Sequence, residues 1–254
     1  MRVDHLWLAR ANPACLDLAV KPTREFQMIS RRSEAEALAQ LQRLKASYQT
    51  FIKLNYEQAA KDCRSCPARG SCCTDAHFVN VNITRLEAVA IRETIARTPR
   101  LTCEEKREVY SRARETVKRY SLSATGDTFQ QTYSCPLFSR KFGCLVHRRA
   151  KPAPCIQHAC YENWEDLPPL SLQTRTEHHV EKLNIEIYGA AWAWLPLPVW
   201  LTLVDPESDG VELKKLEREW SSQELKNKKF SAYSARQLNF KSSSHQRKVL
   251  PVIR

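Results

Sequence analysis

The sequence predicts a mainly α-helical protein that contains one small β-hairpin. Two observations lead to this fold class. Several segments open with a capping box and continue with apolar residues three or four positions apart, which is the pattern of helices that bury one face. One further segment, 133–147, divides into two short strand-like pieces around a turn at 141–143, as expected of a hairpin.

The first predicted helix begins after Ser33, whose capping box with Glu36 precedes a long amphipathic stretch. We expect this helix to face the core and to end near Asp62. Its apolar positions recur at helical spacing: Leu38, Leu41, Leu44, Tyr48, Phe51 and Ile52. Residues 77–83 then alternate like a short strand.

Capping boxes at Thr84, Thr102 and Thr174 predict three further helices, which run to about residues 97, 120 and 188. A proline-containing linker, 163–170, precedes the last of them. The most apolar stretch, 187–204, contains two prolines and is shorter than a usual membrane span. We therefore expect it to form core or a docking surface and not a transmembrane helix.

These elements divide the chain into four regions. We expect an N-terminal arm and helix (1–62), a cysteine-cluster metal-binding domain (63–160), a helical and apolar extension (161–220) and a basic, flexible tail (221–254). The tail holds a single acid, Glu224, against eight lysines and arginines, a composition typical of mobile or partner-ordered segments.

The charge balance favours an anionic partner. Lysine and arginine number 40 against 28 acids, which gives a formal net charge of +12. Nucleic acid, an acidic protein or a membrane surface would each suit this excess, and the charge alone does not choose among them. Asp4, Arg10 and Asp17 interrupt the apolar runs of the N-terminus, so we expect no signal peptide and a cytoplasmic location.

Several familiar activities lack their motifs. The chain has only five glycines, and no two are placed for a GxGxxG loop or a Walker A loop, so a common nucleotide cradle is not expected. No HExxH, paired-carboxylate or Ser-His-Asp pattern indicates hydrolysis. Whether the protein is an enzyme stays open at this point.

The cysteines carry the strongest chemical signal. The first group reads CRSCPARGSCC, and the second follows within 135–160. A CxxC turn aims two thiolates at one point, which suits zinc or an iron–sulfur cluster, and reduced cytoplasmic thiols more often bind metal than form disulfides. We therefore predict a metal-stapled cysteine-rich core whose ligands come from eight cysteines: Cys63, Cys66, Cys72, Cys73, Cys135, Cys144, Cys155 and Cys160.

The remaining candidate ligands are weaker. His77, His147 and His158 lie within or beside the motifs and could replace a thiolate, although a role outside the metal shell is the simpler expectation for each. Cys15 is expected to be a buried thiol and Cys103 an ordinary helix residue. Two metal sites, or one site with spare thiols, both fit eight cysteines.

The motif spacing resembles the YkgJ-type cysteine-cluster family, described as zinc- or iron-chelating. The matching residues, spread over 63–160, are Cys63-Arg64-Ser65-Cys66, Cys72-Cys73, Val81-Asn82-Ile83-Thr84 with Glu87, Cys135-Pro136-Leu137-Phe138, Cys144-Leu145-Val146-His147, Lys151-Pro152 and Cys155. This chain departs from the pattern in its five-residue gap between Cys66 and Cys72. It also has His147 in place of a tyrosine, Lys151 in place of an arginine, and Ile156 where an arginine follows the last cysteine of the pattern.

The resemblance implies metal binding by the matching cysteines. One branch of the family, the flagellin lysine methylases, is linked to iron–sulfur-dependent methyl transfer. We expect a metal-binding protein that holds an iron–sulfur cluster or zinc and supports a redox or protein-modification reaction. Iron–sulfur is favoured because eight cysteines exceed the need of one zinc and because of that branch. The alternatives are a zinc-stapled interaction module for nucleic acid or an acidic protein, and a lysine methylase-like enzyme.

Overall fold

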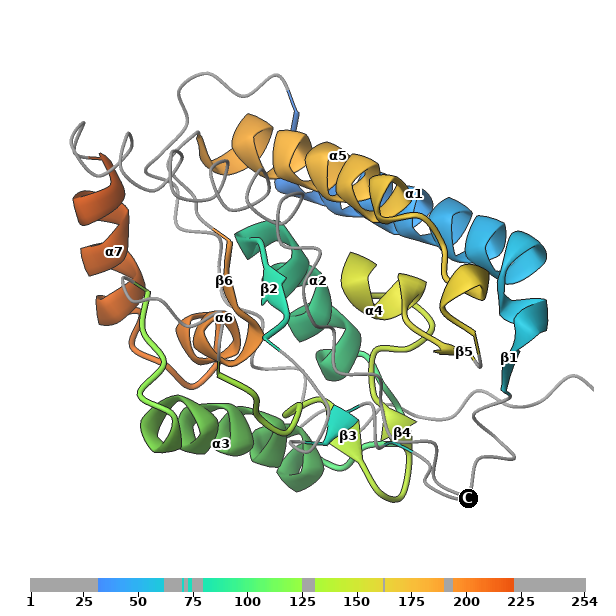
Figure 1. The fold of residues 1–254 in the computed structure, drawn as a ribbon. Coiled ribbons are helices and arrows are strands. Elements are labelled where there is room, and N and C mark those ends of the chain that lie inside the picture. Colours follow the sequence, from blue (N-terminus) through green and yellow to red (C-terminus); the bar gives the residue numbers. More distant parts are fainter. Residues whose placement is uncertain are drawn as a thin grey trace, which may run out of the picture.

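The structure is a computed structural model of the chain that describes residues 32–61, 70, 73–74, 80–124, 131–161, 163–189 and 194–221. Seven α-helices and three two-stranded antiparallel sheets make up these ranges (Figure 1). The predicted mainly helical fold with a small hairpin is therefore confirmed. Most of the predicted arm and nearly all of the predicted basic tail lie outside the described residues.

Three predicted capping boxes are present and begin three helices. Helices α1 (Glu34–Asn55), α2 (Arg85–Ala96) and α3 (Cys103–Arg119) start after Ser33, Thr84 and Thr102. In each, the hydroxyl of the cap accepts from the backbone of the third helical residue, whose glutamate accepts from the cap in return. Two otherwise unpaired backbone donors are satisfied locally, which is why short-range sequence predicts these starts well.

Helix α1 ends earlier than predicted, at Asn55 and not near Asp62. A short 3₁₀ turn, η2 (Glu57–Ala59), follows, and strand β1 (Ala60–Lys61) then pairs with β5 (Cys160–Tyr161). A strand partner 100 residues away in the chain supplies these hydrogen bonds, so local periodicity could not reveal the boundary.

The predicted start of helix α5 was wrong. The helix spans Leu170–Tyr188 and begins directly after Pro169, one turn before the predicted cap. Thr174 lies inside it and donates its hydroxyl to the Leu170 carbonyl at 3.1 Å. The extra turn packs Leu172 against the cluster of Tyr48, Ile52, Ala153 and Ile156, so tertiary burial determines where this helix begins.

The predicted hairpin is confirmed and is short. Strands β3 (Phe138–Ser139) and β4 (Gly143–Cys144) pair antiparallel, with Phe138 opposite Cys144. Gly143 has a φ of 74°, a left-handed conformation that glycine adopts without steric cost and that closes the three-residue loop. The predicted strand at 77–83 is seen only as β2 (Asn82–Ile83), which pairs with β6 (Leu195–Pro196), and 75–79 lie outside the described residues.

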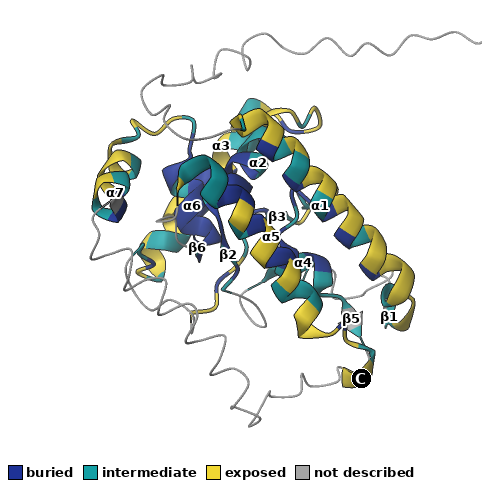
Figure 2. Cartoon of the chain, turned by 90° about the horizontal axis from the view of Figure 1, so that it is seen from above, coloured by how far each residue is buried: buried dark blue, intermediate teal, exposed yellow. Residues whose placement is uncertain are grey.

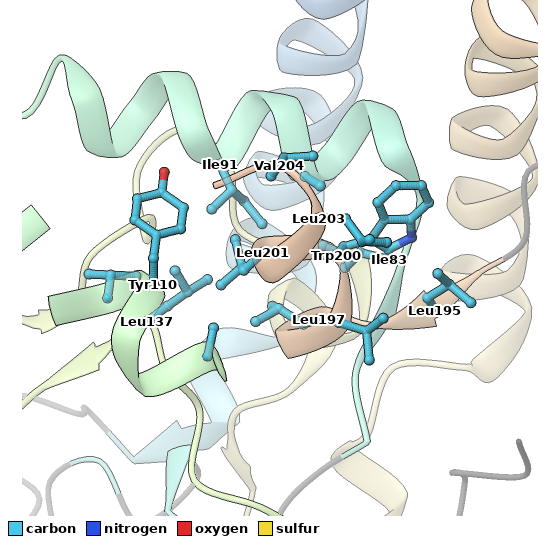
Figure 3. Close-up of a cluster of buried hydrophobic side chains, with 14 of the residues drawn as sticks. Ile83, Ile91, Tyr110, Leu137, Leu195, Leu197, Trp200, Leu201, Leu203 and Val204 are labelled. Atoms are coloured by element: carbon cyan, nitrogen blue, oxygen red, sulfur yellow. The ribbon is translucent and has the colours of Figure 1, made fainter. Parts of the chain in front are cut away.

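The apolar stretch 187–204 was predicted to form core or a docking surface, and its part from 195 to 204 lies in the core, whereas 190–193 lie outside the described residues. Helix α6 (Leu197–Leu203) follows β6, and every residue of α6 except Thr202 is buried. Figure 3 shows its side chains among those of α2 and α3, with Ile91, Tyr110 and Leu201 close together. No helix in the described ranges has the length and apolarity that crossing a bilayer requires.

The main core joins distant parts of the chain. Its residues come from positions between Val81 and Trp220, the latter in helix α7 (Val211–Ser221). Cys135, Cys144 and Cys155 pack against the same core, Cys155 from the short helix α4 (Ala153–Gln157). The segment that carries the second cysteine group is therefore built onto the hydrophobic core and is not a separate loop.

Helices α1 and α5 form a second layer. They lie side by side along one edge of the molecule, and their exposed faces look away from the core (Figures 1 and 2). Their inner faces share a small apolar cluster with α2: Ala37, Leu41, Leu86, Val180 and Leu183. Asn184 of α5, which is buried, accepts a hydrogen bond from the Leu86 backbone at 3.0 Å and so joins α5 to the start of α2.

Charged groups are buried between these layers. The Lys45 ammonium of α1 lies 2.6 Å from the Glu87 carboxylate of α2, and both side chains are almost completely excluded from solvent. Glu87 also accepts from the Thr84 backbone at 3.0 Å through its other oxygen, so one carboxylate serves both the helix cap and the ion pair. Figure 1 shows α1 crossing beside α2 at this layer.

Glu177 of α5 makes the stability of this layer pH-dependent. Burial raises the pKa of its carboxyl to about 7, the hydrogen bond from Gln173 opposes this, and the neighbouring Glu87 and Glu181 add to it. Tyr48 of α1 also faces the group. Because the folded pKa lies above the ordinary 4.5, the stabilisation is complete below pH 4.5 and is lost as pH rises through about 7.

We therefore expect Glu177→Gln to be more stable than the unsubstituted protein above pH 7, by up to about 3 kcal/mol. Near pH 4 the two should differ little, because both then carry a neutral group. Urea unfolding at a series of pH values measures this difference. An advantage of Glu177→Gln that stays the same from pH 4 to pH 8 would contradict the expectation.

Candidate metal centre

Described residues on both sides of the undescribed part of the first cysteine segment contact the second cysteine segment. Lys61, two residues before Cys63 in the sequence, lies opposite Cys160 in the β1–β5 pair. The carbonyl of Cys73 accepts a hydrogen bond from the backbone of Cys135 at 2.9 Å. These two backbone contacts place Lys61 and Cys73 beside the second cysteine group, although helices α2 and α3 separate them in the sequence.

The turn that leads to Cys73 lies directly on the hairpin. Cys73 donates its backbone N–H to the Gly70 carbonyl at 2.8 Å. Gly70 has a φ of 89°, and a Cβ built on it would lie 2.0 Å from the ring of Phe138. Only glycine permits both this backbone conformation and this approach, so the glycine in CRSCPARGSCC brings the cysteine turn onto β3.

The second segment is held from beneath by helix α3. Arg112 donates two hydrogen bonds to the Pro136 carbonyl, at 3.0 and 3.2 Å, immediately after Cys135. Phe138 then donates its backbone N–H to the Cys135 carbonyl at 3.0 Å, which forms the turn into the hairpin. The CP motif therefore has a defined conformation, set partly by a side chain that the sequence analysis did not select.

Tyr133 is a second residue that the sequence analysis missed. Its side chain is buried in the core, and its ring makes a tilted contact with Tyr120, with the ring centres 6.2 Å apart. Within the described residues, its hydroxyl has no hydrogen-bond partner. Burial raises the pKa of this phenol, and the nearby thiols of Cys135 and Cys155 raise it further. The only available signal was its position two residues before Cys135.

The eight predicted ligands are described unequally. Cys73, Cys135, Cys144 and Cys155 are partly buried thiols that form no disulfide. For Cys160 the structure gives the backbone in β5, and Cys63, Cys66 and Cys72 lie outside the described residues. Within the described ranges, no group of three or more Cys, His, Asp or Glu side chains is arranged to hold a metal ion. The predicted metal-stapled core therefore stays a prediction.

Two of the three candidate histidines have a side-chain pKa below the ordinary value. Burial and then the cation of Lys151 lower the pKa of His158 to about 4. Partial burial and then Lys151 and Arg148 lower the pKa of His147 in the same direction. Neutral imidazole is the form that binds metal, so both rings are in a suitable state near neutral pH. His77 lies outside the described residues.

One cysteine differs from its prediction. Cys103 is the first residue of α3, as expected, but it is disulfide-bonded and not an ordinary thiol. Its partner is not among Cys73, Cys135, Cys144 and Cys155. The sequence alone gave no reason to expect that Cys103 forms a disulfide, because disulfide connectivity depends on which segments meet in space. Cys15 lies outside the described residues.

Comparisons of the chain with protein-family models, with curated proteins and with solved structures found no match.

Proposed function

We propose that this protein is a cysteine-cluster metal-binding protein of the YkgJ type, which holds an iron–sulfur cluster or zinc. One observation carries the proposal: the carbonyl of Cys73 accepts from the backbone of Cys135. The last cysteine of the first group thus lies beside the first cysteine of the second group, although they are distant in sequence, and this supports a metal shared between the groups.

The donor set suits such a metal. Thiolates are the preferred ligands of iron–sulfur clusters and of structural zinc. Cys73, Cys135, Cys144 and Cys155 would supply part of the shell, and Cys63, Cys66, Cys72 and Cys160 the rest. When bound, an iron–sulfur cluster would supply electron transfer for a redox or protein-modification reaction, whereas zinc would supply folding energy alone. The Tyr133 hydroxyl, which has no partner among the described residues, is a donor that a nearby metal-bound thiolate would satisfy.

Anaerobic purification followed by elemental analysis tests this proposal. Iron with acid-labile sulfide and visible charge-transfer absorption would identify an iron–sulfur protein, and stoichiometric zinc would identify a structural zinc protein. Protein that is folded, free of both metals and unable to take up either would overturn the proposal.

Tyr133→Phe should change metal affinity and stability in opposite directions. Removing a buried hydroxyl that lacks a partner should stabilise the metal-free protein by about 1 kcal/mol. The same change should weaken metal binding by about tenfold, because a donor to a ligating thiolate is lost. Chelator competition measures the affinity, and thermal unfolding of the metal-free protein measures the stability.

Tyr120→Phe is the matched control, since Tyr120 contacts the ring of Tyr133. It should leave metal affinity unchanged. If Tyr133→Phe also leaves metal affinity unchanged, the Tyr133 hydroxyl does not interact with a metal ligand.

A further inference from the structure

We propose that the hollow between helix α1 and the segment 148–156 binds a compact phosphate group. Four residues of α1 form one wall: Gln42, Lys45, Ala46 and Gln49. Arg148, Arg149, Lys151 and Ile156 form the other. The hollow measures about 270 Å³, part of which is open solvent. This proposal does not depend on whether the protein binds metal.

Among the described residues, no acid compensates the positive charge of this hollow, since none of the described lining residues is acidic. Within the described ranges, Arg148, Arg149 and Lys151 form no ion pair, and their side chains make no hydrogen bond there. Three cations with unused donors around one concave site create a field that concentrates anions. Arg85 and Arg107 differ in this respect, because each pairs with a glutamate.

The side-chain amides of the α1 wall can also donate hydrogen bonds. Gln42 and Gln49 lie seven residues apart on α1, about two helical turns, so both side chains project from the same face. Their amides make no hydrogen bond to any described residue, and both line the hollow. Amide N–H groups and guanidinium groups together offer the several directed donors that the oxygens of a phosphate accept.

The side chain of Lys45 lines the hollow, but its charge does not contribute to the positive field there. Its ammonium is buried and lies 2.6 Å from Glu87, so the two charges offset each other within the core. Only the remainder of its side chain is left to line the hollow, beside Ala46 and Ile156. The base of the hollow is therefore fixed by the core, and the cations that are unpaired among the described residues lie at its rim, where Arg148 and Arg149 are exposed.

A compact terminal phosphate suits this arrangement better than a nucleic-acid backbone. The cations gather around a single hollow, whereas nucleic-acid binding distributes phosphate contacts along a strip of surface. A terminal phosphate carries up to two charges on one group and can accept from several donors at once, while each backbone phosphodiester carries one. An arginine fork binds carboxylate or phosphate in a bidentate manner, but a terminal phosphate has three free oxygens and up to two charges, so it can accept from two forks at once, which a single carboxylate does less well.

Isothermal titration of the purified full-length protein with inorganic pyrophosphate tests the proposal. We expect saturable binding that weakens by about tenfold for each cation removed, so Arg148→Gln/Arg149→Gln should lose most of it. The matched control is Lys214→Gln/Arg218→Gln, which removes the same charge from exposed positions of α7. Helix α7 lies at the left edge of both views, apart from α4, with α6 and β2 between them in Figure 1 (Figures 1 and 2). The control should bind pyrophosphate as the unsubstituted protein does.

A parallel titration with a short single-stranded oligonucleotide separates the two sources of phosphate. Pyrophosphate binding that is sensitive to Arg148 and Arg149, with weaker or no oligonucleotide binding at the same ionic strength, supports the proposal. Absence of pyrophosphate binding, equal losses in the variant and in the control, or oligonucleotide binding without pyrophosphate binding would each overturn it. Circular dichroism of every variant confirms that the variants are folded.

Discussion

Replacing Cys135 by serine should release the metal and destabilise the region where the two cysteine groups meet. Cys135 lies where the backbone of Cys73 meets the second segment, and its carbonyl begins the turn into the hairpin. If metal–thiolate bonds hold the two cysteine groups together, loss of one ligand lets the groups separate. The chain between them then regains conformational entropy, which favours the separated state. We expect a stability loss of about 4 kcal/mol and a fall in melting temperature of about 10 °C.

Two companion variants sharpen this experiment. Cys66→Ser should lose metal and hairpin protection as well, because the proposed site draws on both groups. Cys103→Ser should keep the full metal content, since Cys103, the first residue of α3, is not among the eight proposed ligands. Metal quantification and limited proteolysis of anaerobic samples measure both effects. A Cys135→Ser protein that keeps its metal and a protected 135–160 segment would show that the cysteines do not share a site.

Lys45→Met should cost about 3–5 kcal/mol at neutral pH, because it leaves the Glu87 carboxylate buried without its counter-charge. The pair is 2.6 Å apart, and the two side chains are 4% and 1% exposed, so water cannot replace the lost partner. Methionine keeps most of the volume of the lysine stem, which separates the charge effect from a packing defect. Urea unfolding measures the loss of stability.

The double variant Lys45→Met/Glu87→Gln should recover most of that stability. Glutamine at the third helical position can still accept from the Thr84 backbone, as Glu87 does now, so the capping box survives. Glu87→Gln alone should be destabilising, because it leaves the ammonium unpaired. A single Lys45→Met change that costs less than about 1 kcal/mol would mean that the pair is screened by solvent, as surface pairs are.

The sequence alone was sufficient where the determining interactions are local. The caps at Ser33, Thr84 and Thr102 bond to residues three positions along, and these three of the four predicted helix starts are confirmed. The hairpin is confirmed for the same reason, since Gly143 permits its tight turn. The apolar composition of 187–204 predicted core or a docking surface, and the structure buries 197–203 in the core, because leaving such a run in water would cost hydrophobic free energy.

Tertiary contacts decided what the sequence pattern could not. On α1, Leu41 and Ile52 are buried as predicted, but Phe51 is 44% exposed, and Lys45 occupies the buried face. Helical periodicity predicts that a charged residue faces solvent. Lys45 can be buried only because Glu87, on a different helix, pairs with its charge.

The same distinction applies to the candidate site. Cysteine spacing selected the thiols, because tight spacing is a property of the sequence itself. The meeting of Cys73 with Cys135, the approach of Gly70 to Phe138 and the buried Tyr133 hydroxyl depend on how α2 and α3 bring separate segments together. Those contacts join residues some sixty positions apart, and their formation rests on the burial of the whole core, which no short stretch of sequence encodes.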